Sequence, residues 1–126
     1  MLLIDPITCL AAALYFEARG ELKINQLRVA EVIYNRVESK RYPNTICEVV
    51  KENDQFTFFW DGKKEEVKDK NAWKLSLQYA TQSLDTHLDM KGYCNYAHVD
   101  VDNDWTRKLQ EDKQTHGAHV FYKGEC

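Results

Sequence analysis

The sequence predicts an α+β domain that is mostly helical, with a small β element near the C-terminus. Apolar residues recur at helical spacing along the first two-thirds of the chain, which indicates helices packed on a core. Residues 92–99 and 118–123 are instead aromatic and β-branched and are bounded by Gly92 and Gly117, a pattern typical of short, paired strands. The length of 126 residues suits one domain, expected to span residues 1–126.

The first helix is expected over residues 6–19. Asp5 is a favourable N-cap, Pro6 suits the first helical position, and Gly20 is a typical C-terminal stop. The apolar stripe of this helix consists of Ile7, Leu10, Ala11, Leu14 and Ala18. Such a stripe predicts a helix with one face turned toward the core.

Three more helices are expected further along the chain. Asn25 is the expected N-cap of the second helix, and Asn44 or Thr45 caps the third. The second helix should end near Ser39, because a residue before proline, here Tyr42, is biased away from helical dihedrals. The expected bounds are 25–39, 46–51 and 71–85.

Two segments show no regular period. Residues 52–71 contain an aromatic cluster followed by a charged run, and we expect an irregular connection there. Residues 100–115 are polar, with Trp105 as the expected anchor. No repeats or low-complexity stretches divide the chain.

Composition and charge exclude several classes of protein. The net charge of -3 and the pI near 5.8 give none of the basic footprint of a nucleic-acid binder. The mean hydropathy is -0.60, and no apolar run approaches the ~18 residues of a membrane span. We therefore expect a monomer without nucleic-acid partner, membrane insertion or cofactor. No signal peptide is visible, which predicts a cytoplasmic protein until release.

The sequence holds four cysteines, Cys9, Cys47, Cys94 and Cys126. None forms a C-x-x-C pair, so a structural zinc site is not expected. Cys9 lies on an apolar helical face, where reduced core packing is the simplest interpretation. Cys126 is terminal and expected to be exposed, and the even count alone leaves disulfides open.

Glu17 is the residue with the clearest chemical signal. It lies three residues after Leu14 and seven after Leu10, so it continues the buried stripe. Burial and the negative end of the helix dipole both disfavour its anion, which predicts a raised pKa and suits a general acid. The alternative is a surface glutamate paired with Arg19 or Lys23.

A second chemical signal is the stretch "QFTFFWDG" at residues 55–62. Aromatic rings stack on sugars and glutamine amides bond to hydroxyl and acetamido groups, so the stretch fits a carbohydrate groove. Core aromatics followed by an Asp61-Gly62 turn are the alternative. Glu21 follows Gly20 and is expected to cap or to form a salt bridge.

Taken in order, these segments resemble the SleB-type cell wall hydrolase family. The resemblance rests on "AAALYFEARGE", then "VIYNRV" at 32–37, "YPNTICEVV" at 42–50, "QFTFFWDG", and "HVFYK" at 119–123. It covers the chain from about residue 8 to 123. Known members of the family are spore cortex-lytic enzymes and related bacterial and phage peptidoglycan hydrolases.

The resemblance implies a compact, lysozyme-like fold. It also implies cleavage of glycan strands between N-acetylmuramic acid and N-acetylglucosamine, often by lytic transglycosylation, with peptidoglycan as the partner. Matched residue by residue, Glu17 is the catalytic acid/base and Tyr96 contacts substrate, although Asn95 and Ala97 replace histidines often found beside that tyrosine. The remaining matches are Gln55, Phe56 and Phe58 as substrate-binding residues and Glu21 and His119 as auxiliary residues.

Four functions remain open from the sequence. The first is a lytic transglycosylase, in which one carboxylate suffices. The second is a hydrolytic muramidase, in which Glu21 or Asp61 positions water. The others are a non-catalytic wall-binding or phage structural module and a metal-dependent amidase, although the sequence contains no H-E-x-x-H motif. The short form also suits a phage endolysin that a holin releases.

Overall fold

The computed structural model describes residues 5–52, 67–86 and 88–126. Within these residues the chain forms, in order, α1 (Pro6–Ala18), α2 (Lys23–Glu38), α3 (Ile46–Lys51), α4 (Lys70–Ser83), β1 (Asn95–His98), α5 (Asp104–Lys108), β2 (Gln114–His116) and β3 (His119–Tyr122). The prediction of a mostly helical α+β domain with a small C-terminal β element is confirmed.

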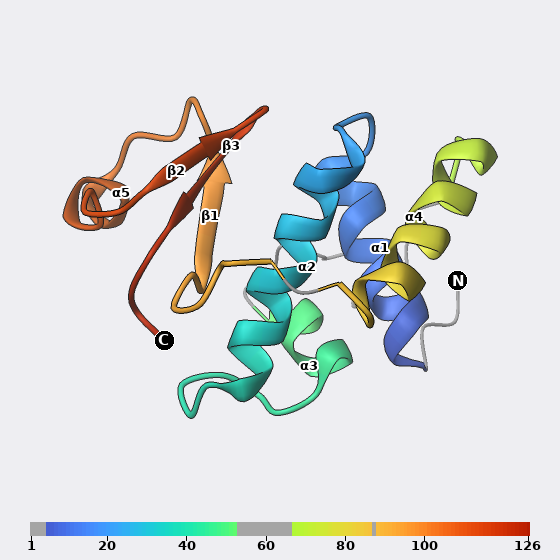
Figure 1. The fold of residues 1–126 in the computed structure, drawn as a ribbon, viewed down its shortest axis with the longest axis horizontal. Helices are drawn as coiled ribbons and strands as arrows, with labels where there is room; N and C mark the ends of the chain where they lie inside the picture. Colours follow the sequence, from blue (N-terminus) through green and yellow to red (C-terminus); the bar gives the residue numbers. More distant parts are fainter. Residues whose placement is uncertain (1–4, 53–66, 87) are drawn as a thin grey trace.

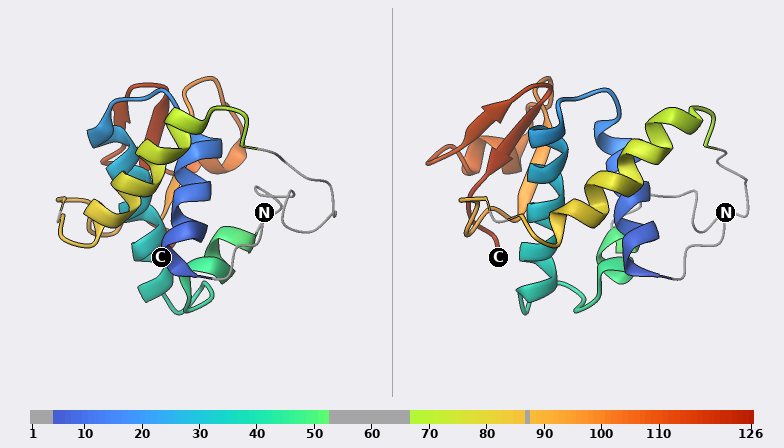
Figure 2. Two further views of the ribbon diagram at one scale, coloured as in Figure 1. Left: turned by 90° about the vertical axis from the view of Figure 1, so that its right-hand side faces the viewer. Right: turned by 45° about the vertical axis from the view of Figure 1, so that its right-hand side comes forward.

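Helix α2 lies at the centre of the molecule (Figures 1 and 2). On one side of it stand α1, α3 and α4, and on the other side stand the sheet and α5. Helix α2 contacts both groups, since it packs on α1, α3, α4 and β1. The helical part and the β part of the fold therefore meet across this one helix.

Local capping explains where most of the helices begin. The side chain of Asp5 accepts a hydrogen bond from Thr8 N at 2.9 Å, and that of Asp69 accepts one from Ala72 N at 2.9 Å. Thr45 caps α3 in the same way. Each cap satisfies a backbone N–H that has no partner inside its helix.

The predicted cap of the second helix is wrong. Helix α2 begins at Lys23, and Asn25 lies inside it with its side chain buried. Gly20 has a φ of 87° and turns the chain sharply after α1, so helical bonding resumes at once, with Leu22 O accepting from the N–H groups of Asn25 and Gln26. The asparagine that resembled a cap instead accepts a hydrogen bond from Arg28 at 2.8 Å.

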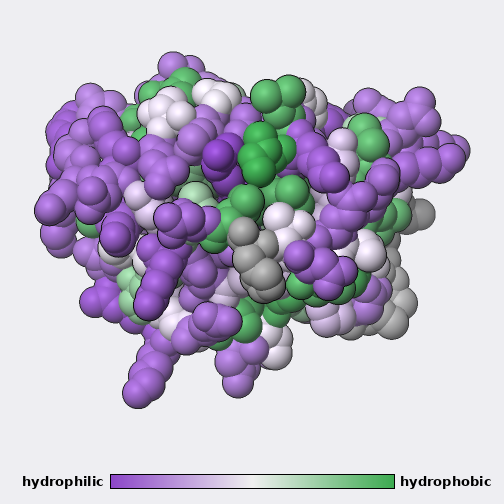
Figure 3. Space-filling view, viewed as in Figure 1, coloured by the Kyte–Doolittle hydropathy of each residue, from purple (hydrophilic) through white to green (hydrophobic). Residues whose placement is uncertain are grey.

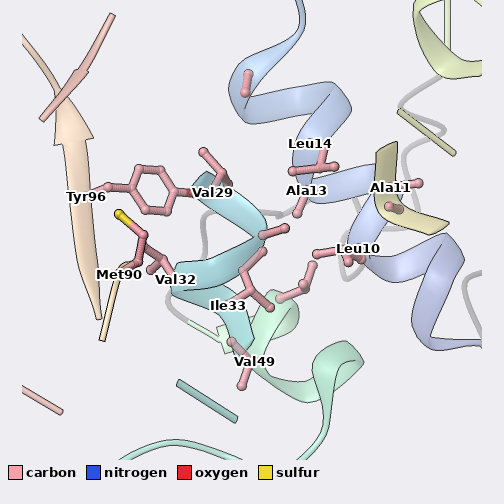
Figure 4. Close-up of a cluster of buried hydrophobic side chains, with 14 of the residues drawn as sticks. Leu10, Ala11, Ala13, Leu14, Val29, Val32, Ile33, Val49, Met90 and Tyr96 are labelled. Atoms are coloured by element: carbon pink, nitrogen blue, oxygen red, sulfur yellow. The ribbon is translucent and has the colours of Figure 1, made fainter. Parts of the chain in front are cut away.

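The main core forms where α1 and α2 face each other. Figure 4 shows Leu10 and Leu14 of α1 directed toward Val29 and Ile33 of α2. On the other side of α2, the Tyr96 ring of β1 points toward the helix. Burial of each such aliphatic side chain contributes roughly 1.5–3 kcal/mol, so this cluster fixes the position of α1.

The sheet has the strand order β1-β3-β2 and is antiparallel throughout. Strand β1 pairs with β3 in a register that sets Tyr96 opposite Phe121. The predicted strand pair is thus confirmed, whereas β2 and α5 were missed. Helix α5 lies inside the polar segment of residues 100–115, and β2 lies at its edge. A capping box formed by Asn103 begins α5. Trp105 packs edge-on against Tyr122 at 5.4 Å but stays partly exposed.

All four cysteines form disulfides, Cys9–Cys47 and Cys94–Cys126. The interpretation of Cys9 as a reduced core residue is therefore wrong. Cys9 is buried as expected, but its side chain lies on the face of α1 that packs against α3, where Cys47 is within bonding distance. A helical stripe cannot reveal this, because the pairing depends on where α3 docks.

Among the described residues, no helix combines the length and apolarity needed to cross a membrane.

Candidate active site

Glu17 lies in the last turn of α1 with its side chain partly buried. Burial raises the pKa of its carboxyl group, whereas positive charge on His119 and Arg36 opposes that rise. The predicted direction of the pKa is therefore confirmed, with burial as the largest cause. Because burial favours the neutral form, Glu17 is suited to hold a proton that it can donate.

Arg19 does not neutralise Glu17. The guanidinium of Arg19 stacks over the ring of Tyr15, 4.4 Å from its centroid, and also donates a hydrogen bond to the Tyr15 hydroxyl. Within the described part of the chain, no ion pair joins Glu17 to Arg19 or Lys23. The interpretation of Glu17 as a paired surface glutamate therefore has no support.

Tyr96 and His119 form the wall of the site on the side of the sheet. Both side chains are buried, and their rings meet edge to face with centroids 5.5 Å apart. Burial raises the pKa of the Tyr96 hydroxyl, and the charge of Glu17 raises it further. Tyr96 is thus electrostatically coupled to Glu17. The contact of Tyr96 with substrate, which the family resemblance implies, stays a prediction.

Arg36 is a buried charged residue that the sequence analysis did not single out. Its side chain is 6% exposed, and its Nε donates to the carbonyl oxygen of Cys94 at 2.7 Å. The guanidinium also lies over the ring of Tyr42, 5.1 Å from the centroid. The charge of Arg36 lowers the pKa of Glu17 and so favours the anionic form of that carboxyl group. In the sequence, Arg36 is the arginine of "VIYNRV", after a buried apolar stripe, and this position could have indicated a buried charge.

Asn35 precedes Arg36 and anchors the same segment. Its side-chain amide donates to the carbonyl oxygens of Met90 and Tyr93, at 2.8 and 2.9 Å. Together the two residues fasten the chain that leads into β1 to the last turns of α2. They therefore help to fix the position of β1, which carries Tyr96.

Glu21 forms hydrogen bonds with the turn between β2 and β3 and with the first residue of β3. Its Oε1 accepts a hydrogen bond from Ala118 N at 2.6 Å, and its Oε2 lies 2.7 Å from His119 Nδ1. Glu21 was predicted to cap or to form a salt bridge, and its short contact is with His119, an ion pair when that ring is protonated. Since each oxygen already has a partner, Glu21 is poorly placed to activate water.

The predicted site is only partly covered by the structure. Glu21 binds His119, whose ring packs on Tyr96, and both His119 and Tyr96 interact electrostatically with Glu17. Gln55, Phe56, Phe58 and Asp61 fall outside the described residues. Figure 3 shows a mostly hydrophilic surface on which apolar side chains gather near the middle, between the sheet and the helices. Among the described residues, no three His, Cys, Asp or Glu side chains group closely enough to hold a metal ion.

The fold is that of the lysozyme-like class, and it holds a partly buried carboxylic acid at the end of a helix that is electrostatically coupled to side chains of a small sheet. The chain belongs to the cell wall hydrolase family, whose sequence profile matches residues 20–122.

Curated relatives include spore cortex-lytic enzymes of Bacillus cereus and Bacillus subtilis. These are 45% and 44% identical over 58 residues, which is 46% of this chain. The matched region is 22% of the Bacillus cereus protein and 19% of the Bacillus subtilis protein, so the chain spans about a fifth of these relatives.

Two solved structures share the fold over almost the whole chain. The catalytic domain of the germination-specific lytic transglycosylase SleB from Bacillus anthracis has a TM-score of 0.74 and 28% identity, covering 97% of both chains. The catalytic domain of Bacillus cereus SleB has a TM-score of 0.71 and 30% identity, covering 94% of this chain and 89% of that one. The likeness supports the lysozyme-like fold implied by the sequence motifs.

Proposed function

We propose that this protein degrades peptidoglycan as a glycosidase, cleaving the strand between N-acetylmuramic acid and N-acetylglucosamine. The observation that carries the proposal is Glu17, a partly buried acid with a raised pKa in a chain of the cell wall hydrolase family. A neutral carboxyl group can protonate the glycosidic oxygen while positive charge develops on the sugar. The related Bacillus anthracis protein is a lytic transglycosylase, which supports the same chemistry here.

The proposed route is lytic transglycosylation with Glu17 as both acid and base. Glu17 donates its proton to the leaving oxygen as the bond between that oxygen and the muramic C1 breaks. The C6 hydroxyl of the same muramic residue then bonds to C1, and its proton returns to Glu17. The strand ends in an anhydromuramic residue, no water is consumed, and the enzyme regains its starting state.

The charges around Glu17 favour this route over a two-carboxylate hydrolysis. Electrostatic interactions with His119 and Arg36 stabilise the Glu17 anion that exists between the two proton transfers. Among the described residues, no second carboxylate contributes to the pKa of Glu17. A hydrolytic muramidase needs a second carboxylate or another group to activate water. Glu21, the nearest acid along the chain, already binds Ala118 and His119.

The decisive experiment compares the wild type with Glu17→Gln on purified sacculi. The wild type should clear the suspension, and the variant should lose activity by at least about 100-fold, the usual contribution of a general acid. Glu48→Gln, at an exposed position of α3, is the matched control and should retain full activity. A Glu17→Gln protein that lyses walls normally would exclude Glu17 as the acid.

Mass spectra of the released muropeptides identify the route. Anhydromuramic ends indicate transglycosylation, and reducing muramic ends indicate hydrolysis. A wild type that sediments with sacculi but releases nothing would favour the alternative, a non-catalytic wall-binding module. Activity that disappears in chelator would favour the metal-dependent amidase.

Storage in the cytoplasm until a holin releases the protein remains a prediction from the sequence. Cytosolic thiols are normally kept reduced, whereas both cysteine pairs of this protein are oxidised. We therefore propose that the disulfide-bonded form acts outside the cytoplasm, where the cell wall lies. Thiol labelling of protein recovered from each compartment would test this.

A further inference from the structure

One carboxylate joins two turns that lie almost a chain length apart. Glu21, in the turn between α1 and α2, binds Ala118 N and His119 Nδ1, which are 97 and 98 positions further along the chain. The side chains are 13% exposed for Glu21 and 6% for His119, so this pair is largely shielded from water. Charge-assisted hydrogen bonds in such surroundings are stronger than exposed ones.

The turn between β2 and β3 is shaped to receive Glu21. Gly117 has a φ of 60°, and a Cβ atom built there would collide with Glu21 Oε1 and lie 2.8 Å from Asn25 Nδ2. Only a residue without a side chain lets the turn approach this closely. The contact therefore depends on a feature of each partner, a carboxylate on one side and a glycine on the other.

The histidine held by Glu21 belongs to the wall of the active site. Its ring packs edge-on against Tyr96, and the rings of Phe121 and His98 lie 6.2 and 6.4 Å away. Glu21 Oε2 is hydrogen-bonded to His119 Nδ1. A residue of the α1–α2 turn therefore fixes the orientation of the His119 ring. A shift of Glu21 would therefore shift His119 against Tyr96.

Three groups from three elements act on Glu17. Arg36 belongs to α2 and His119 to β3, and both lower the pKa of Glu17, while Tyr96 of β1 is coupled to the Glu17 charge. Arg36 is held independently by the carbonyl oxygen of Cys94. Glu21 thus controls the placement of one of the two residues that lower the pKa of Glu17.

We propose that Glu21 is a positioning residue, which holds the β2–β3 turn and His119 at the distance from Glu17 that the reaction requires. Glu21 is neither the acid nor the water-activating group in this scheme. It acts through Ala118 and His119, which it touches, on Glu17. The inference rests on the proposed function for its kinetic consequences, but not for the contact itself.

The test is a double-variant cycle of Glu21→Gln and His119→Gln. The glutamine at position 21 keeps an oxygen for Ala118 N but loses the negative charge that faces His119. Each single variant should lower kcat by about tenfold to 100-fold with little change in KM, the size expected when catalytic geometry is displaced. The double variant should be no slower than the slower single variant, because both remove the same interaction.

The pH dependence separates positioning from mere stabilisation of the fold. The interaction with His119 lowers the pKa of Glu17, so His119→Gln should raise that pKa and move the alkaline limb of the lysis profile to higher pH. Glu21→Gln should also displace this limb, because His119 is then no longer held in place. The control Glu48→Gln has the same change in net charge and should leave the limb unchanged. Independent, multiplicative losses in the double variant would overturn the proposal.

A nuclear magnetic resonance titration of the Glu17 carboxyl group provides a readout that needs no lysis. The titration midpoint should shift in Glu21→Gln and in His119→Gln, and it should stay in place in Glu48→Gln. If the wild type fails to cleave peptidoglycan but these shifts occur, the proposed function is wrong and the positioning contact stands. If the midpoint in Glu21→Gln equals that of the wild type, the positioning role is refuted.

Discussion

Burial of Glu17 favours its neutral form in the folded protein and leaves its charged form poorly solvated. In the unfolded chain the same carboxyl group is surrounded by water, with an ordinary pKa near 4.5. Because the folded pKa is higher, this group favours folding below the unfolded pKa. That contribution is lost as the pH rises through the folded pKa. The proposed general acid therefore weakens the fold at neutral pH.

Glu17→Gln should consequently be more stable than the wild type near neutral pH. Glutamine has nearly the same shape and carries no charge to bury, so the free energy of unfolding should rise at about pH 7. The gain should shrink as the pH falls toward 4.5, where the wild-type carboxyl group is also neutral. Urea denaturation at several pH values measures both quantities. A variant that is less stable than the wild type at pH 7 would contradict the linkage.

Among the described glycines, Gly117 in the turn between β2 and β3 leaves the least room for a side chain. Gly117→Ala places a methyl group against Glu21 Oε1 and forces alanine into the left-handed region. We expect a loss of about 1–2 kcal/mol in the free energy of unfolding from the backbone conformation alone. Displacement of Glu21 should add to it and should also slow lysis.

Gly20→Ala is the matched control for this substitution. Gly20 also has a positive φ, 87°, but a Cβ atom there meets no described atom within 4 Å. Both variants share the conformational penalty, and the collision with Glu21 is specific to Gly117→Ala. Urea denaturation should therefore rank Gly117→Ala below Gly20→Ala. Equal stabilities would show that the turn does not press on Glu21.

The elements differ in how far the sequence predicts them. The first helix was predicted to within a residue because its cap, proline and stop glycine are local signals that no tertiary contact overrides. Asn25 was wrongly predicted as the N-cap of the second helix. Its side chain accepts a hydrogen bond from Arg28 and lies beside Gly117 instead. Strand β2 was missed because three polar residues acquire strand structure only by pairing with β3.

Across the whole molecule, the raised pKa of Glu17 was predictable from local signals, whereas Tyr96, Glu21 and His119 were assigned to the site only through the family resemblance. Glu17 stands out because a carboxylate on a buried stripe is a local anomaly in the sequence. Its partners come from segments more than 75 positions away, since Tyr96 and His119 belong to the sheet. Arg36 is near in sequence, but its role depends on the Cys94 carbonyl, which only the docking of β1 brings to it. Which cysteines pair also depends on how distant segments pack, so the sequence pattern does not show it.

The two disulfides connect different parts of this arrangement. Cys9–Cys47 joins α1 to α3 on the side of the helices, whereas Cys94–Cys126 ties the segment before β1 to the end of the chain. They close segments of 38 and 32 positions. For loops of this size, each bridge should contribute about 2–4 kcal/mol to the free energy of unfolding.

Removing the bridges one at a time should separate stability from activity. Cys9→Ala with Cys47→Ala should lower the free energy of unfolding and leave kcat nearly unchanged at a temperature where the variant is folded. Cys94→Ala with Cys126→Ala should lower both, because the Cys94 carbonyl oxygen holds Arg36 beside the site of Glu17. Urea denaturation and sacculus clearing measure the two effects on the same samples. Equal kcat values for the two double variants would show that the anchor of Arg36 does not depend on the second bridge.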